Sequence, residues 1–242
     1  MTGPLVPDWL ERRARTHARR PALRFGELTW SYAELDEAAA AGAAALAALS
    51  PDPAAPVALL AGNGPAFVAT VHGAVRGGRA IVPLNTRLTA PELAWQVRNA
   101  GAGLLLHDDL HADLALRAAA DAGGVPTAAL GARGPEAERA GAPVAGTALP
   151  LERLQAIVHT SGTTGTPKGA MLPLASWWHG AAGSSLHLGS RADDHWLAAM
   201  PLFHVGGLSI LFRAAIGGAA VTLHEGFDPE RMNRALEREG VT

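Results

Sequence analysis

The chain has 242 residues, 48% of them hydrophobic, which is enough for one large domain or two small lobes with a substantial core. Its formal net charge of -2 gives no electrostatic case for nucleic acid or an acidic membrane as partner, and no apolar stretch reaches the about 18 residues that stable membrane insertion needs. Cysteine is absent, which excludes disulfides and thiolate chemistry, and with the lack of a signal-peptide pattern this predicts a cytoplasmic protein.

The first elements form a hairpin followed by a helix. Residues 22–25 and 28–32 flank a Gly-Glu turn and predict two antiparallel strands. Ser31 precedes Glu34 by three positions, which is the spacing of a capping box. We therefore expect a helix that begins there and runs through Leu49.

Short apolar strands then alternate with helices as far as residue 107. The expected strands and helices, in chain order, are residues 57–60, 66–76, 80–84, 90–99 and 103–107. Such alternation is typical of a parallel sheet with helices on both faces. Residues 131–150 are rich in Gly, Ala and Pro and predict a connector, so we expect a first α/β lobe over residues 1–150.

A second α/β lobe is expected over residues 151–242. Its expected strands, helices and extended segments are residues 154–159, 170–174, 176–187, 196–200, 208–216, 219–224 and 229–239, the last with Asp228 as its N-cap. The chain stops after the first residues of what should be another strand. The expected fold class is therefore α/β, with two doubly wound, mainly parallel lobes, and the sequence is expected to be truncated.

The polar loop at residues 160–169 concentrates groups that bind phosphate. Three glycines allow tight turns that gather backbone N–H groups, five hydroxyl residues add donors, and Lys168 adds a positive charge. The loop is not a Walker A motif, because Pro167 precedes and Gly169 follows the lysine, and it lacks the third glycine of a dinucleotide fingerprint. A flexible linker is the alternative, but linkers do not usually follow an apolar strand directly.

This loop reads TSGTTGTPKG and resembles, residue for residue, the T-S-G-T-T-G-x-P-K-G loop of the adenylate-forming superfamily. That superfamily includes acyl-CoA synthetases, luciferases and nonribosomal-peptide adenylation domains. Residues 200–208 are similar to its P-x-F-H-x-x-G block, and residues 77–93 to its early block ending in P-L-N. The resemblance covers nearly the whole chain and implies the large N-terminal, AMP-binding domain of such an enzyme.

The resemblance implies a ligase whose substrates are a small-molecule carboxylic acid, ATP and coenzyme A, with Mg²⁺ as cofactor. The acid attacks the α-phosphorus of ATP, pyrophosphate leaves, and the thiol then displaces AMP. Lys168 and His204 are the implied catalytic residues, and Thr163 lies nearest the metal. The implied ATP-binding residues are Thr160, Ser161, Gly162, Thr163, Thr164, Gly165, Thr166, Lys168 and Gly169.

The implied acid pocket involves His204, Gly206, Gly207 and Arg213. A histidine in an apolar stretch is ordinarily a satisfied core residue, but relatives place an aromatic residue or histidine here beside the reacting carboxylate. Arg213 follows within apolar residues, so it either extends to solvent or holds a second carboxylate. Residues 201–230 particularly resemble the o-succinylbenzoate–CoA ligases of menaquinone synthesis, and medium-chain fatty-acid and aryl acid–CoA ligases are alternatives.

The superfamily also needs an adenine-binding loop, a ribose-binding Asp and a C-terminal domain with a catalytic lysine, all expected beyond residue 242. We therefore expect the chain alone to be inactive or nearly so. A non-catalytic nucleotide-binding module and an adenylation domain that serves a carrier protein remain alternatives, and a homodimer remains open. The other histidines show no H-E-x-x-H pattern of a zinc site.

Overall fold

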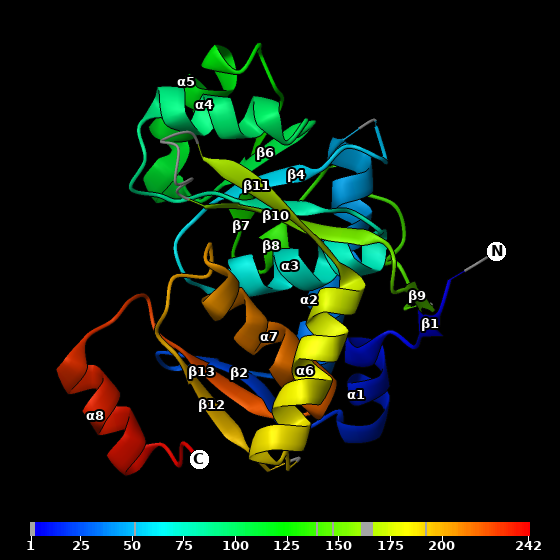
Figure 1. Ribbon diagram of the computed structural model, residues 1–242, viewed down its shortest axis with the longest axis vertical. Helices are drawn as coiled ribbons and strands as arrows, with labels where there is room; N and C mark the ends of the chain where they lie inside the picture. The colour runs from blue at the N-terminus through cyan, green and yellow to red at the C-terminus, as the bar shows by residue number, and fades with distance from the viewer. Residues whose placement is uncertain (1–2, 51, 139, 147, 161–166, 192) are drawn as a thin grey trace.

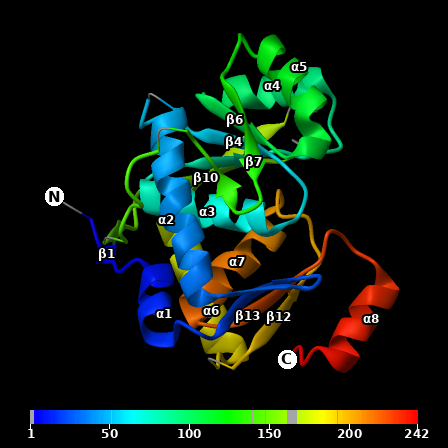
Figure 2. The same ribbon diagram turned by 180° about the vertical axis from the view of Figure 1, so that it is seen from behind.

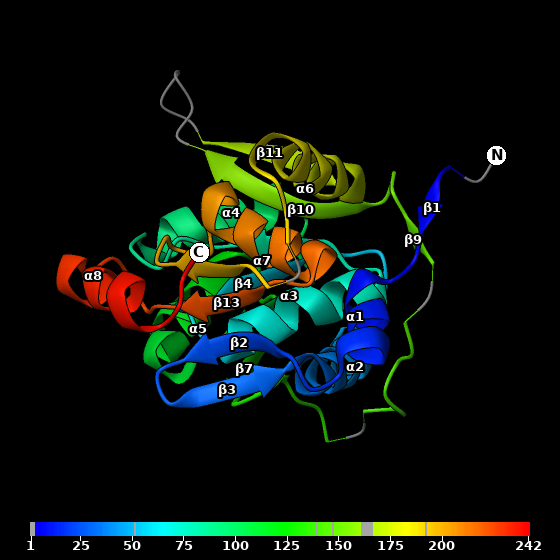
Figure 3. The same ribbon diagram turned by 90° about the horizontal axis from the view of Figure 1, so that it is seen from below.

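The computed structural model describes residues 3–50, 52–138, 140–146, 148–160, 167–191 and 193–242. Their strands form a seven-stranded sheet, a four-stranded sheet and a two-stranded ribbon. A layer of helices lies between the two larger sheets (Figures 1 and 3). The expected α/β class with helices on both faces of a mainly parallel sheet is confirmed.

The seven-stranded sheet has the order β11-β10-β5-β4-β6-β7-β8. Its strands are β4 (Val57–Leu60), β5 (Ile81–Pro83), β6 (Leu104–His107), β7 (Thr127–Gly131), β8 (Gly134–Pro135), β10 (Leu154–Thr160) and β11 (Lys168–Pro173). The five inner strands run parallel, whereas β11 and β8 are antiparallel to their neighbours at the two edges. Apolar residues fill both faces of β4, as expected for a strand covered on both sides.

The four-stranded sheet has the order β12-β13-β2-β3. Its strands are β2 (Pro21–Phe25), β3 (Leu28–Ser31), β12 (His195–Ala198) and β13 (Ala220–Leu223). The expected hairpin is confirmed, because β2 and β3 pair antiparallel, with Phe25 opposite Leu28. A separate two-stranded ribbon joins β1 (Leu5–Val6) to β9 (Leu149–Pro150).

Helices occupy three layers around these sheets. On the outer face of the seven-stranded sheet lie α4 (Ala90–Asn99), the 3₁₀ helix η1 (Asp109–His111) and α5 (Ala112–Asp121). The middle layer contains α1 (Trp9–His17), α2 (Tyr32–Leu49), α3 (Pro65–Gly77), α6 (Leu174–Leu188) and α7 (Val205–Gly217). Beside the four-stranded sheet lies α8 (Pro229–Arg238) (Figure 2). Within the described ranges, no helix combines the length and apolar character needed to cross a bilayer.

The expected helix caps are confirmed. The Ser31–Glu34 capping box is formed, and the backbone N–H of Ser31 donates to Glu34 Oε2 at 2.7 Å. Thr89 opens α4 in the same way, and Asp228 accepts from the first turn of α8. Gly78 ends α3 with a φ of 73°, a left-handed conformation that favours glycine.

The two sheets do not follow the predicted division of the chain at residue 150. Strands β10 and β11, from the second predicted lobe, extend the first sheet, where Ala156 pairs with Ile81 of β5. Conversely, the N-terminal hairpin completes the second sheet, where Leu23 pairs with Val221 of β13. The reason is physical: an apolar strand pattern predicts a buried strand but carries no information about which distant strand it will pair with.

Several elements fall where the sequence predicts none. The segment after residue 107 forms η1, α5 and β7. The expected connector at residues 131–150 holds only the short strands β8 and β9 among its described residues. In α5, Ala115, Ala118 and Ala119 form the buried side, and alanine gives a weak apolar signal.

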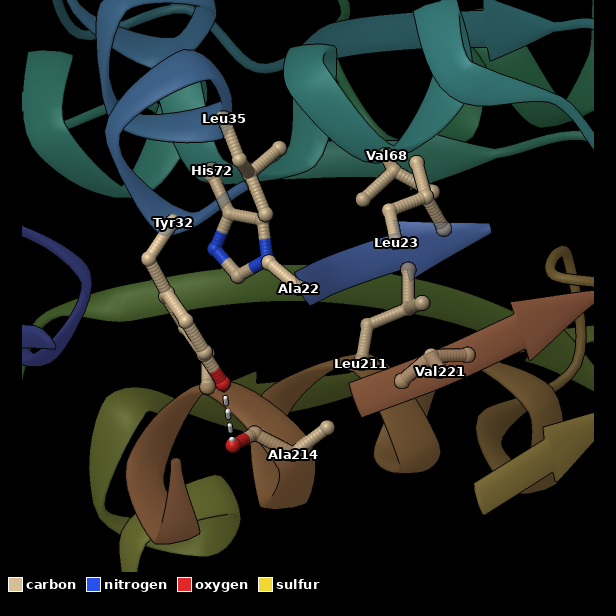
Figure 4. A pocket seen from close by; sticks show the side chains of 10 residues that line it. Ala22, Leu23, Tyr32, Leu35, Val68, His72, Leu211, Ala214 and Val221 are labelled. Atoms are coloured by element: carbon tan, nitrogen blue, oxygen red, sulfur yellow. Dashed lines mark hydrogen bonds between the residues drawn. The ribbon is translucent and has the colours of Figure 1, made fainter. Parts of the chain in front are cut away.

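The middle of the core contains a small cavity of about 10 Å³ where α2, α3 and α7 meet (Figure 4). Tyr32 is buried there, and its hydroxyl donates to the carbonyl oxygens of Ala214 at 3.1 Å and Ala219 at 2.7 Å. His72 lines the same cavity and is 3% exposed. Within the described residues its Nδ1 has no hydrogen-bond partner.

His72 should make the fold sensitive to acid. Burial lowers the pKa of His72 to about 4, against the attraction of Asp8, and Arg76 lowers it further. Below a pH of about 6.5 the His72 ring is protonated in the unfolded chain but stays neutral in the folded chain. The free energy of unfolding should therefore fall by a few kcal/mol between about pH 6.5 and 4. Urea unfolding at several pH values in this range measures how steeply the free energy of unfolding falls as the pH is lowered. The fall should be smaller in His72→Leu than in the exposed-site control His179→Leu. An equal fall in the two variants would contradict the role of His72.

Candidate functional site

The candidate phosphate loop begins and ends on one β-hairpin. Strand β10 ends at Thr160 and β11 begins at Lys168, and these two residues are paired across the hairpin. The Thr160 hydroxyl donates to the carbonyl oxygen of Lys168 at 3.5 Å, and both residues are exposed. The predicted ATP ligands between them lie outside the described residues: Ser161, Gly162, Thr163, Thr164, Gly165 and Thr166.

Gly169 permits a close approach within this hairpin. It pairs with His159, and a Cβ built on Gly169 would lie 2.9 Å from Ile157 Cγ2 and 3.4 Å from His159 Nε2. Its small size therefore makes room for the His159 ring beside the base of the loop. The predicted contact of Gly169 with ATP remains a prediction.

His159 is held between the loop and α4. Its Nε2 lies 3.2 Å from Asn99 Oδ1, and its ring meets the Trp95 ring edge-on, with centroids 5.7 Å apart. Burial lowers the pKa of His159, which favours the neutral ring. Its Nδ1 is buried without a hydrogen-bond partner in the described part of the chain. Sequence reasoning missed this residue, although it directly precedes the loop.

An open cleft of about 1020 Å³ lies against the base of the loop. Its walls come from α4, the ends of β5 and β10, and the start of α7. The lining residues are Pro83, Asn85, Leu88, Pro91, Glu92, Trp95, Gln96, Val158, His159, Thr160, Pro167, Phe203, His204 and Val205. The cleft thus brings together two of the predicted site residues, Thr160 and His204, which are far apart in sequence.

His204 sits at the N-cap of α7 with an extended backbone (φ −93°, ψ 147°). Its side chain is exposed to the cleft, and its ring centroid lies 4.4 Å from that of the buried Phe203. The alternative interpretation of His204 as a satisfied core residue is therefore wrong. An imidazole in this position can donate or accept a hydrogen bond to a ligand in the cleft.

Gly207 permits a close backbone approach rather than contact with the cleft. A Cβ built there would lie 2.5 Å from the carbonyl oxygen of Pro201 and 3.0 Å from that of Met200. At Gly206 the nearest atom is the flexible end of the Met200 side chain, 2.8 Å away. Neither glycine lines the cleft, so their predicted contact with substrate remains a prediction.

The two glycines give a matched pair of variants. Gly207→Ala should lower the free energy of unfolding by about 1–3 kcal/mol, because backbone atoms must move. Gly206→Ala should cost less, because the Met200 side chain can turn away, while both variants share the gain in helix propensity. Urea unfolding of the two variants tests this. Equal losses in the free energy of unfolding would show that the first turn of α7 does not pack closely against the backbone of the preceding segment.

Arg213 is not brought to the cleft. It lies nine residues beyond His204, about 13 Å along the helix, and faces α6 and β12. Its Cζ lies 4.9 Å from the Trp196 ring centroid, and its Nη atoms donate to Ser184 Oγ at 3.3 Å and Ser209 Oγ at 3.0 Å. The expected pocket that unites His204 with Arg213 is not seen, because the helix separates them.

The described residues form no metal site of their own. Among them, no group of three or more His, Asp or Glu side chains is placed to bind a metal ion. The predicted magnesium contact, Thr163, lies outside the described residues. Thr160 lines the cleft and is paired with the exposed Lys168, and a hydroxyl beside an ammonium group suits a polyphosphate, which brings its own metal ion.

Comparison with known proteins places this cleft in context. The family model of the AMP-binding enzymes matches residues 10–242. A 2-succinylbenzoate–CoA ligase from Geobacillus kaustophilus strain HTA426 is 38% identical over 237 residues, which are 98% of this chain and 47% of the relative. A ligase of the same name from Bacillus cereus is 36% identical over 98% of this chain and 47% of its own length. The chain therefore spans about half the length of the curated relatives it matches.

Solved structures give a similar result. The o-succinylbenzoate CoA synthetase of Bacillus subtilis, in complex with its acyl-adenylate intermediate, is 31% identical with a TM-score of 0.88, over 99% of this chain and 61% of that one. The same enzyme with ATP and magnesium gives 30% and 0.86, over 99% and 63%. The N-terminal domain of FACL13 from Mycobacterium tuberculosis, bound to an inhibitor, gives 28% and 0.86, over 97% and 61%.

Proposed function

This chain belongs to the AMP-binding enzyme family, and we propose that it forms the phosphate- and acid-binding part of an ATP-dependent, AMP-forming acid–CoA ligase. One observation carries the proposal. In the β10–β11 hairpin, Lys168 is paired with Thr160, which lines the same cleft as His204. The proposal assigns the phosphates to the hairpin and the substrate carboxylate to the His204 imidazole, within this one cleft.

The chemistry follows from this placement. The Lys168 ammonium stabilises the negative charge of the triphosphate as pyrophosphate departs. His204 orients the carboxylate that attacks the α-phosphorus, and the bond to pyrophosphate breaks as the acyl-adenylate forms. Coenzyme A thiol then displaces AMP to give the thioester. Magnesium supplies charge neutralisation at the phosphates when it arrives with ATP.

We assign o-succinylbenzoate as the acid, in menaquinone synthesis. The 2-succinylbenzoate–CoA ligases matched at 38% and 36% identity support this choice, as does the similarity to the Bacillus subtilis synthetase. The proposal places the enzyme in the cytoplasm, consistent with its cysteine-free composition. Because the relatives are about twice as long, we assign turnover to a longer protein in which these residues form about the first half.

Exchange of labelled pyrophosphate into ATP tests the function. In the longer protein, o-succinylbenzoate should support exchange, whereas a panel of medium-chain fatty acids and simple benzoates should not. The 242-residue chain alone should remain at background. Exchange driven best by a fatty acid would overturn the acid assignment, and ATP binding with no exchange for any acid would favour a non-catalytic module.

A further inference from the structure

Asn63 joins the two sheets beside the cleft. It follows β4 of the seven-stranded sheet, in a Gly-Asn-Gly-Pro turn that leads into α3. Its side chain crosses to the segment between β12 and α7. The Nδ2 group donates to the carbonyl oxygens of Met200 at 3.0 Å and His224 at 2.9 Å, and Oδ1 accepts from the Leu202 N–H at 2.8 Å.

A primary amide is the side-chain group that fits these three partners. Two carbonyl oxygens require two donors, and the Leu202 N–H requires an acceptor on the same group. An aspartate of the same shape would accept the Leu202 bond but would set a carboxylate against two carbonyl oxygens. An alanine would leave three backbone groups without this partner.

The segment that Asn63 binds carries the cleft residues of the second sheet. Residues 199–204 are neither helix nor strand, so their backbone groups depend on irregular partners. Asn63 supplies partners on one side, while Gly207 of α7 packs closely on Pro201 from the other. Phe203 and His204 follow directly and line the cleft.

The turn that carries Asn63 is itself held in place. The Gly62 N–H donates to Asp108 Oδ2 at 2.8 Å, and Asp108 Oδ1 accepts from the His111 N–H at 3.0 Å. Hence Asn63 is fixed to the first sheet, which also carries the phosphate-loop hairpin. Its amide is a direct connection between that sheet and the segment bearing His204.

We propose that Asn63 is a positioning residue: its amide sets the place of His204 relative to the end of the β10–β11 hairpin, so that an acid held by His204 faces a triphosphate held by Lys168. This inference rests on the proposed function for the role of His204. The connection itself rests only on the three hydrogen bonds.

The test uses Asn63→Asp and Asn63→Ala in the 242-residue chain, with Asn233→Asp at an exposed site of α8 as the matched control. Histidine ring signals in NMR spectra, with that of His204 identified by its loss in His204→Gln, should shift in both Asn63 variants. Exchange of the Leu202 amide should quicken about tenfold or more in Asn63→Ala, which removes its hydrogen-bond acceptor, and should change less in Asn63→Asp, whose carboxylate still accepts that bond. Amides of β4 should keep their protection, which establishes that the chain remains folded.

A binding measurement separates positioning from general damage. Affinity for o-succinylbenzoate should fall about tenfold in the Asn63 variants, while affinity for tripolyphosphate should change less than about twofold. The proposal would be overturned if the His204 signal stayed unchanged in both variants and the Leu202 amide exchange stayed unchanged in Asn63→Ala. It would also be overturned if the wild-type chain bound the acid and both variants bound it equally well. If the wild-type chain binds neither probe, the proposed function fails, and the NMR signals still decide whether Asn63 positions His204.

Discussion

Replacing Lys168 with alanine should lower the rate of acyl-adenylate formation in the longer protein by about 100- to 1,000-fold, the usual loss when one group that stabilises developing charge is removed. Lys168 begins β11, its side chain is exposed, and its partner Thr160 on β10 lines the cleft. Its ammonium can therefore reach phosphates that enter between the hairpin and α7. Pyrophosphate exchange measures the loss, and Lys168→Arg should recover part of the rate because the charge is kept.

The same residue gives a direct probe in the 242-residue chain. Lys168 is the only lysine in the sequence. Labelling lysine at its ε-carbon therefore gives one side-chain NMR signal, which should shift when tripolyphosphate is added. In Lys168→Ala the affinity for tripolyphosphate should fall about tenfold or more, since a charge-assisted hydrogen bond is lost.

Arg238→Ala is the control, because it removes one positive charge from the exposed end of α8. It should leave the affinity near that of the wild-type chain. A Lys168 signal that does not respond to tripolyphosphate, or an affinity unchanged in Lys168→Ala, would remove the main support for the proposed ligase. General attraction of an anion to a charged surface would instead weaken binding equally in both variants.

The sequence predicts those parts of the fold whose signals are local. The limits of β4 agree residue for residue with the expected strand, and the Ser31–Glu34 capping box opens α2 as predicted. Each depends on residues within a few positions of one another, so composition and spacing are sufficient. Helix α5 was not predicted, because alanine forms its buried side and gives only a weak apolar pattern.

Contacts between residues that lie far apart in the sequence could not be predicted. The sequence marks the turn at Asn63 but does not indicate that its amide reaches residues about 140 positions away. Likewise, Arg213 has the residue type expected of a carboxylate-binding group, but its place on the far part of α7 depends on how α6 and β12 pack. A residue type predicts what a side chain can bind, whereas packing decides what it meets.

Arg76 is another residue whose contacts depend on packing and could not be predicted from the sequence. Its replacement should have the largest effect on stability. Its Nε donates to Asp8 Oδ2 at 2.9 Å, and its guanidinium also pairs with Asp36. The side chains of Arg76 and Asp8 are 2% and 3% exposed. Asp8 also accepts from the Leu10 and Glu11 N–H groups, which caps α1. One arginine thus ties α1, α2 and α3 together.

We expect Arg76→Leu to lower the free energy of unfolding by about 3–5 kcal/mol, because Asp8 would remain buried without its counter-charge. Arg191→Leu breaks an exposed pair with Asp193 and should cost about 1 kcal/mol or less. Adding Asp8→Asn to Arg76→Leu should recover part of the loss, since asparagine caps a helix without a charge. Urea unfolding of the four proteins measures these differences. If Arg76→Leu costs no more than Arg191→Leu, or if Asp8→Asn adds to its loss, the buried charge of Asp8 is not what Arg76 compensates.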